Sequence, residues 1–277
     1  MRSRSYLLLS IPLCLAGAAL QCWSLATGYE PGTGLPIAGA PALTALTVFA
    51  VAVPVLALLL SLPLRGGRTA RPEGLYAGIP LPGSLLGALS GGLTAAAGVL
   101  LLLRDLPAAL NRPQILDIGV CAVDLLLVLG GGSMVWMALS ARKEGRTAGH
   151  SLAALLPGFA GCFRLVIFYH NHSRDPVVAH YCWMLLALMA AILALYYQAG
   201  FSFDHPRPLR AMTCTMTAAI YAFTALPASE SLADALLLAG LGLWMLLNIP
   251  LLLRTGQTRG RREMRAAPPA ATEAETE

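Results

Sequence analysis

The chain has 277 residues, of which 57% are hydrophobic and only 12% are charged, and its formal net charge at pH 7 is +5. Soluble domains carry about 25% charged residues, so this composition excludes an ordinary water-soluble protein and indicates a membrane protein. The basic residues are scattered between apolar stretches and form no concentrated positive patch, so no nucleic-acid partner is predicted.

Eight apolar stretches, separated by short polar or Gly- and Pro-rich loops, predict eight transmembrane helices. Each stretch is close to the ~20 residues that a helix needs to cross the hydrocarbon layer of a lipid bilayer. The predicted fold is therefore an all-α, polytopic transmembrane helix bundle over residues 1–254, followed by a disordered cytoplasmic tail at 255–277. In chain order, the spans are expected at residues 5–27, 41–64, 83–103, 115–139, 151–170, 177–199, 209–227 and 231–253.

The first span has a second interpretation. Arg2 and Arg4 precede an apolar run that reaches Ala16, Gly17 and Ala18, and this pattern is also typical of a signal peptide with its cleavage site. Cleavage there would leave seven spans and an N-terminus outside the cell. The count of eight also depends on the third stretch, which is rich in Gly and Ala, and on the seventh, which is rich in Thr.

The third stretch carries Gly83, Gly87 and Gly91 at four-residue spacing. Small residues at this spacing line one face of a helix and let a second helix approach closely. The stripe predicts a packing surface, either within the protein or between two membrane chains. A homo-oligomer or a partner membrane subunit is therefore one predicted use of these glycines, in addition to the lipid bilayer itself.

The fourth and fifth spans contain two intramembrane charges, Asp124 and Arg164. A charged side chain at the bilayer centre costs about 2.5–3.5 kcal/mol on insertion scales, so such residues need a partner or a water-filled cavity. The depths of the two residues differ by about 4–5 Å, and consecutive spans are expected to be antiparallel neighbours. The two side chains are therefore predicted to meet. Asp117, on the same helix face as Asp124, is the rival partner for Arg164.

Residues that disturb helices lie on the same two spans. Gly130, Gly131 and Gly132 follow one another in the fourth span, and Pro157 lies in the fifth. Consecutive glycines weaken a helix, and proline removes a backbone hydrogen bond. Because many transporters build midplane sites from interrupted helices, one interpretation of these residues is local unwinding beside the two charges. The alternative is that they serve close packing, because Gly and Pro are common in membrane helices.

The charges of the fourth and fifth spans support two functional interpretations. In the first, the protein is a transporter or permease-type component, in which Arg164 binds an anion and Asp124 carries a proton or another cation. In the second, the two residues form a structural ion pair within a non-transporting scaffold, sensor or regulatory subunit. The catalytic motifs of soluble enzymes are missing from the sequence, and no cofactor is predicted.

Three histidines lie where the fifth span ends and the sixth begins: His170, His172 and His180, with Asp175 between them. Two histidines with one residue between them, together with a third histidine, offer a ligand set suited to zinc or copper. This group predicts a metal site on the outer face and, with it, a membrane enzyme as a further alternative. The competing interpretation is that these histidines only occupy helix ends near the lipid headgroups.

The basic residues also predict the orientation of the chain. With the N-terminus inside, 15 of the 19 Lys and Arg residues face the cytoplasm, three face outside and Arg164 lies within a span. This distribution follows the positive-inside rule and predicts that both termini are cytoplasmic. All but one of the basic residues are Arg, which together with the high Ala, Leu and Gly content indicates a GC-rich bacterial genome and a location in the bacterial cytoplasmic membrane.

Overall fold

The chain folds into a bundle of membrane-length helices. Within the part of the chain that the structure describes, eight helices are long and apolar enough to cross a membrane, so the predicted all-α class and the eight spans are confirmed. This architecture comes from a computed structural model that describes residues 2–30, 35–64, 79–111, 115–140, 149–173, 178–203 and 206–266. Only the backbone is described for residues 2–5, 115–116, 149–151, 178–180 and 254–266.

The helices begin and end close to the predicted span limits, except that the last one is longer. Residues 255–266 continue the eighth helix instead of forming a disordered tail, and residues 267–277 lie outside the described part of the chain. Short 3-10 turns, η1 (Leu62–Leu64) and η2 (Leu226–Ala228), extend the second and seventh helices. The helices are α1 (Arg2–Thr27), α2 (Pro41–Ser61), α3 (Leu81–Asn111), α4 (Ile115–Ser140), α5 (Gly149–His172), α6 (Val178–Ala199), α7 (Pro208–Ala225) and α8 (Leu232–Ala266).

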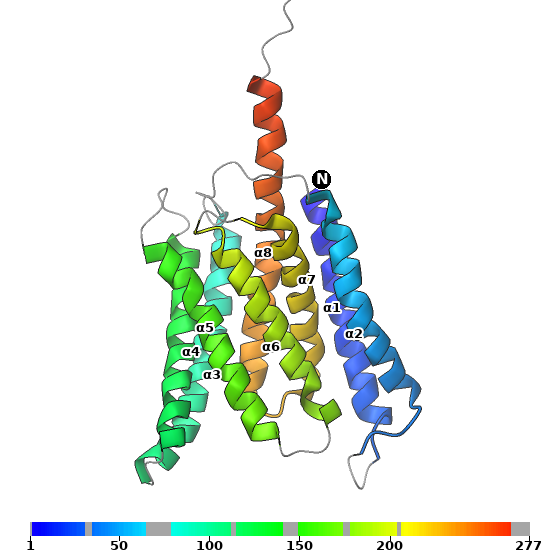
Figure 1. Cartoon of the computed structure of the whole chain (residues 1–277), viewed down its shortest axis with the longest axis vertical. Coiled ribbons are helices and arrows are strands. Elements are labelled where there is room, and N and C mark those ends of the chain that lie inside the picture. Colours follow the sequence, from blue (N-terminus) through cyan, green and yellow to red (C-terminus); the bar gives the residue numbers. More distant parts are fainter. Residues whose placement is uncertain are drawn as a thin grey trace, which may run out of the picture.

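Six of the helices, α3 to α8, form a ring in chain order. Each contacts the next along the chain, and α8 closes the ring by packing against α3. The remaining pair, α1 and α2, packs on the outside of α7, and α1 also contacts α8. The start of α1 and the end of α8 lie at the same end of the bundle, which we call the terminal end (Figure 1). The alternative that α1 is a cleaved signal peptide stays a prediction.

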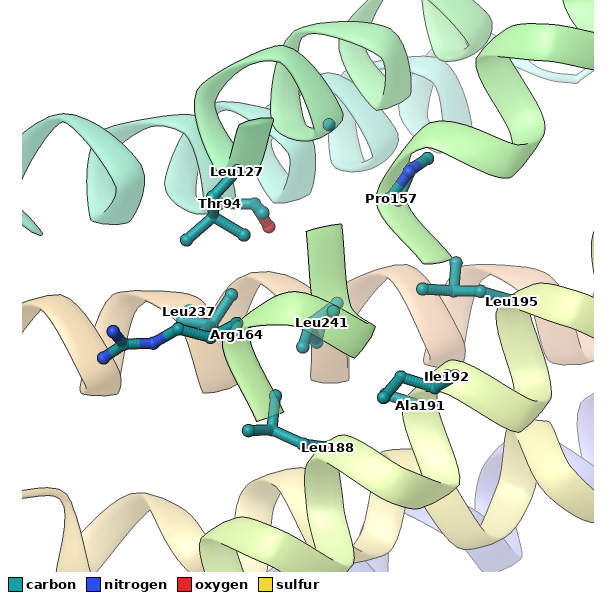
Figure 2. A pocket seen from close by; sticks show the side chains of 12 residues that line it. Thr94, Leu127, Pro157, Arg164, Leu188, Ala191, Ile192, Leu195, Leu237 and Leu241 are labelled. Carbon is teal, nitrogen blue, oxygen red and sulfur yellow. The ribbon is translucent and has the colours of Figure 1, made fainter. Parts of the chain in front are cut away.

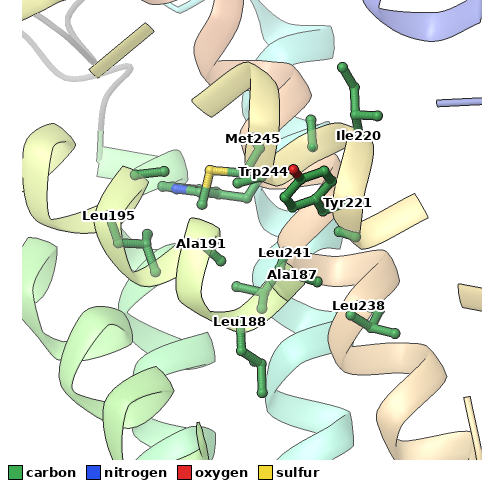
Figure 3. Close-up of a cluster of buried hydrophobic side chains, with 14 of the residues drawn as sticks. Ala187, Leu188, Ala191, Leu195, Ile220, Tyr221, Leu238, Leu241, Trp244 and Met245 are labelled. Atoms are coloured by element: carbon green, nitrogen blue, oxygen red, sulfur yellow. The ribbon is translucent and has the colours of Figure 1, made fainter. Parts of the chain in front are cut away.

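The core lies between α6, α7 and α8 (Figure 3). It includes the fully buried side chains of Trp244, Met245 and Leu188. One polar group is placed within it: Gln198 donates to the hydroxyl of Thr215 at 3.0 Å and accepts a hydrogen bond from the indole N–H of Trp244 at 3.3 Å. The amide of Gln198 has partners on two other helices, so it links α6, α7 and α8. These hydrogen bonds offset the free-energy cost of burying the polar amide.

The burial of α7 explains why its sequence is the least apolar of the eight spans. The buried fraction is 67% for the α7 span and 72% for the α8 span, and it is 50% or less for each of the others. A helix surrounded by protein does not need lipid-compatible side chains on every face. Two of its threonines bond to their own helix, because Thr213 donates to the Leu209 carbonyl and Thr224 to the Ile220 carbonyl.

The glycine stripe of α3 packs within the chain. Gly87 and Gly91 are buried, and a methyl group added to Gly91 would lie 2.7 Å from the Gly131 carbonyl oxygen of α4. On the side of α8, the Ser90 hydroxyl donates to the Gly240 carbonyl at 2.7 Å. Because glycine has no side chain, the backbones of α3, α4 and α8 can approach each other closely at these positions. The first of the two predicted uses of this stripe, packing inside the protein, is therefore the one that the contacts support.

Candidate functional site

Arg164 of α5 is bonded to Asp234, the third residue of α8. Its Nη2 donates to Asp234 Oδ1 at 2.8 Å, and both side chains are buried. The hydrogen-bonded partner of this arginine is therefore neither Asp124 nor Asp117, and the predicted pairing is corrected. The bond crosses the ring of helices, because α5 and α8 are not neighbours within it.

Hydrogen bonds between Ser231 and Asp234 at the start of α8 hold the carboxylate of Asp234 in position for its bond to Arg164. The Ser231 hydroxyl accepts the Asp234 backbone N–H at 3.1 Å and donates to Asp234 Oδ2 at 2.6 Å. Both carboxylate oxygens thus have a partner, and the positive end of the helix dipole adds to their stabilisation. The Ser-x-x-Asp pattern at 231–234 is visible in the sequence, but it indicates only a helix start and not the arginine that binds there.

Asp124 is left without a hydrogen bond. It is 0% exposed, and within the described residues neither of its carboxylate oxygens has a hydrogen-bond partner. Gly130 of α4 lies against Pro157 and Ala160 of α5, and about a turn and a half from this contact the antiparallel helices reach Asp124 and Arg164 at one depth. Asp124 therefore lies within electrostatic range of Arg164 without being bonded to it.

The interior charges at this depth are unbalanced. Arg164 supplies one buried positive charge, whereas Asp124 and Asp234 supply two buried carboxyl groups. Asp105 of α3, which is partly exposed and lies 3.9 Å from the exposed Arg104, adds a third carboxyl group within electrostatic range of Asp124. The arginine is bonded to Asp234, and within the described residues its Nε has no hydrogen-bond partner. A buried charge that is neither paired nor hydrogen-bonded is costly, so the second carboxyl group requires a proton or another cation.

A small cavity lies beside Arg164 (Figure 2). Gly130, Pro157 and Arg164, all predicted site residues, line it together with leucines and other apolar side chains from α6 and α8. The space open to the centre of a water molecule is about 10 Å³, which is room for about one water. The cavity is therefore too small for an organic substrate.

The predicted interruptions of α4 and α5 are corrected. Helix α4 is continuous from Ile115 to Ser140, and α5 continues through Pro157. Gly131 faces the α3 backbone, Gly130 faces Pro157, and a methyl group at Gly132 would meet no atom within 4 Å. Close packing on two faces of α4 explains the first two glycines, and it also holds the helix straight, so no unwinding occurs beside the charges.

His170 and His172 lie about two helical turns beyond Arg164, in the last turn of α5. His172 Nδ1 is 2.8 Å from the Phe168 carbonyl oxygen, and its Nε2 is 3.1 Å from Glu230. His170 is exposed, whereas Asp175 and the side chain of His180 lie outside the described residues. Within the described residues no group of three His, Cys, Asp or Glu side chains could hold a metal ion. The metal site therefore stays a prediction, and His172 is instead bonded to a carboxylate.

The comparisons with known proteins identify no relative of this chain. No family model matches it, and neither a curated protein nor a solved structure is significantly similar to it. The chain is a multi-pass membrane protein by its eight apolar helices. Any finer functional inference therefore depends on the residues of its own interior.

Proposed function

We propose that this protein is a proton-coupled transporter or permease-type component in which Asp124 carries the proton. The observation that supports this proposal is a carboxyl group that is 0% exposed, has no hydrogen-bond partner among the described residues and lies within electrostatic range of a buried arginine. Intramembrane carboxyl groups placed in this way are typical of proton relays in pumps and transporters.

The buried arginine offers a way to couple protonation to a structural change. When Asp124 is protonated, Arg164 is bonded to Asp234, as in this structure. When Asp124 loses its proton, it becomes a second carboxylate at the same depth and competes for the guanidinium. Since α5 carries the arginine and α8 carries Asp234, this competition alters the contact between the two helices. Such a two-state arrangement is what a proton needs in order to drive a conformational change.

Infrared difference spectroscopy tests the proton site directly. The purified protein is titrated with pH, and the carbonyl band of a protonated carboxyl group is compared between the wild type and Asp124→Asn. We expect a band that disappears at high pH in the wild type and is absent from the variant. Asp117→Asn, on the same face of α4 and only half-buried, is the matched control and retains the band. A band that persists unchanged in Asp124→Asn would remove the basis of the proposal.

Proton movement is then measured in liposomes that contain the protein and a pH-sensitive dye, with a potassium gradient and valinomycin to set the membrane potential. We expect faster acidification than in empty liposomes, loss of this difference in Asp124→Asn, and wild-type rates in Asp117→Asn. Equal rates in the wild type and Asp124→Asn would contradict a transport role for this carboxyl group.

A non-transporting scaffold or sensor is the second candidate. The observation that favours it is the small size of the cavity beside Arg164, which admits about one water. In this case Arg164 and Asp234 only join α5 to α8, and Asp124 is a protonated residue of the core. The infrared band would then be present, but its loss in Asp124→Asn would leave liposome acidification unchanged.

A further inference from the structure

A second candidate site lies at the terminal end of the bundle, away from the buried charges. A cavity of about 460 Å³ is found where α6 ends and the chain turns toward α7. Tyr196 and Tyr197 bring phenol rings to it, Phe203 and Leu155 bring apolar surface, and Arg207 brings a positive charge. One cation, two phenols and an apolar wall suit a ligand that has both an anionic group and an apolar part.

A second, apolar space leads away from this cavity along the membrane-spanning part of α5 and α6. Its volume is about 110 Å³, and it shares Leu155 and Tyr196 with the first space. From there it continues past Gly158 and Phe159 to Cys162, about two helical turns or about 10 Å toward the middle of the membrane. The two spaces thus adjoin each other at Leu155 and Tyr196, and together they form one candidate site that is charged at the end of the bundle and apolar within the span.

We propose that these two adjoining spaces bind an anionic phospholipid. The phosphate of the headgroup lies near Arg207 in the larger space, and one acyl chain lies in the smaller, apolar space, which forms a groove between α5 and α6. The position supports a lipid, because the charged part lies at the end of the bundle and the apolar part lies along the span. Tyrosines at this level are typical of the membrane interface.

The charge of the site selects an anionic headgroup over a zwitterionic one. Arg207 occupies the N-cap position of α7, is exposed and lines the cavity. The first turn of α7 behind it adds the partial positive charge of a helix N-terminus. Arg210, also exposed, follows one turn later at the same end but does not line the cavity.

Native mass spectrometry of the full chain in a neutral detergent tests the headgroup. The protein is titrated with phosphatidylglycerol and, separately, with phosphatidylcholine of the same acyl chains. We expect tighter binding of phosphatidylglycerol to the wild type. Arg207→Gln weakens that binding about fivefold, the factor expected for one basic residue beside an anionic headgroup, and changes phosphatidylcholine binding little. Arg210→Gln is the matched control and retains the preference.

The groove is tested by filling it. A methyl group at Gly158 would lie 3.8 Å from the nearest atom, Leu195 Cβ, so Gly158→Leu fits the helix and places its side chain in the groove. We expect it to weaken the binding of both lipids. Gly132→Leu, at a position where an added methyl group meets no atom within 4 Å, is the control and leaves both affinities unchanged. Thermal unfolding of each variant in the same detergent verifies that it is folded.

Three results would overturn the proposal. Equal affinities of the wild type for the two lipids would show that the site does not select an anionic headgroup. If Arg210→Gln weakened phosphatidylglycerol binding as much as Arg207→Gln, the preference would come from general surface charge and not from a specific site. Displacement of phosphatidylglycerol by free glycerol 3-phosphate would show that a soluble phosphate binds without the groove. None of these outcomes bears on Asp124, which lies on a different helix at another depth of the membrane.

Discussion

The buried charges show how one residue can stabilise the bundle and its neighbour can destabilise it. Arg164 and Asp234 form a hydrogen-bonded pair, and Ser231 completes the carboxylate of Asp234. Asp124, at the depth of the arginine, has no such partner among the described residues. Breaking the Arg164–Asp234 pair would lower the stability of the fold, because it leaves a buried charge unpaired. Burying the carboxyl group of Asp124 without a hydrogen bond already lowers that stability.

Arg164→Met should reduce the free energy of unfolding by about 3–5 kcal/mol, because it leaves the carboxylate of Asp234 buried and unpaired. Adding Asp234→Asn to this variant should recover most of the loss, since no buried charge then remains without a partner. Thermal or denaturant unfolding in detergent measures both effects. If the double variant is as unstable as the single one, the pair is not what joins α5 to α8.

Asp124→Leu should raise the free energy of unfolding by about 1–3 kcal/mol, because it removes a buried polar group that has no hydrogen bond. The same substitution at the half-buried Asp117 should change stability by less than about 0.5 kcal/mol. A fall in stability on replacing Asp124 would mean that its carboxyl group has a favourable partner. A gain in stability with loss of proton movement is the result expected for a functional residue.

Among the elements, α4 uses glycines to pack closely on two of its faces. Its glycines let α3 approach on one face and α5 on another, and the helix remains continuous because these neighbours surround it. Glycine in a helix costs about 1 kcal/mol in propensity compared with alanine, so close packing must offset this cost at positions where the glycine is needed.

Gly131→Ala and Gly132→Ala provide a matched pair of substitutions on α4. The new methyl group at Gly131 would lie 2.4 Å from the Ala95 backbone nitrogen, and the one at Gly132 would meet no atom within 4 Å. We expect Gly131→Ala to destabilise the protein by about 1–3 kcal/mol through overpacking. Gly132→Ala should be neutral or up to about 1 kcal/mol stabilising. Equal effects at the two positions in thermal unfolding would contradict the α3–α4 contact.

At the scale of the whole molecule, the eight spans place the two ends of the chain on one side of the membrane. The start of α1 and the end of α8 lie at the terminal end (Figure 1), as an even number of spans requires. The α6–α7 connection with Arg207 lies at this end as well, so the proposed lipid headgroup would contact the leaflet on that side.

Reporter fusions at the two termini test this topology. We expect both reporters to be cytoplasmic, because the predicted spans assign 15 of the 19 basic residues to the side of the termini and the positive-inside rule places such segments in the cytoplasm. The outcome that would contradict the eight-span arrangement is a pair of reporters on opposite sides of the membrane.

The sequence by itself determined the class of the protein, its eight spans and the depth of its intramembrane charges. These features depend on local composition, because about 20 apolar residues form a spanning helix wherever they occur in a chain. Counting residues along two consecutive helices also predicts that Asp124 and Arg164 lie within about 4–5 Å of each other in depth. The use of Gly87 and Gly91 for close packing could be predicted for the same reason, although their partner helix could not.

Only the tertiary structure decided which charges meet. Arg164 and Asp234 are 70 residues apart in the chain, and their bond depends on how α5 and α8 are rotated about their axes and how the ring closes. The sequence pattern does not determine these rotations, because packing on all sides of α7 and α8 sets them together. Asp124, the residue level with Arg164, is therefore the one left unpaired, and that non-local outcome makes it the candidate proton site.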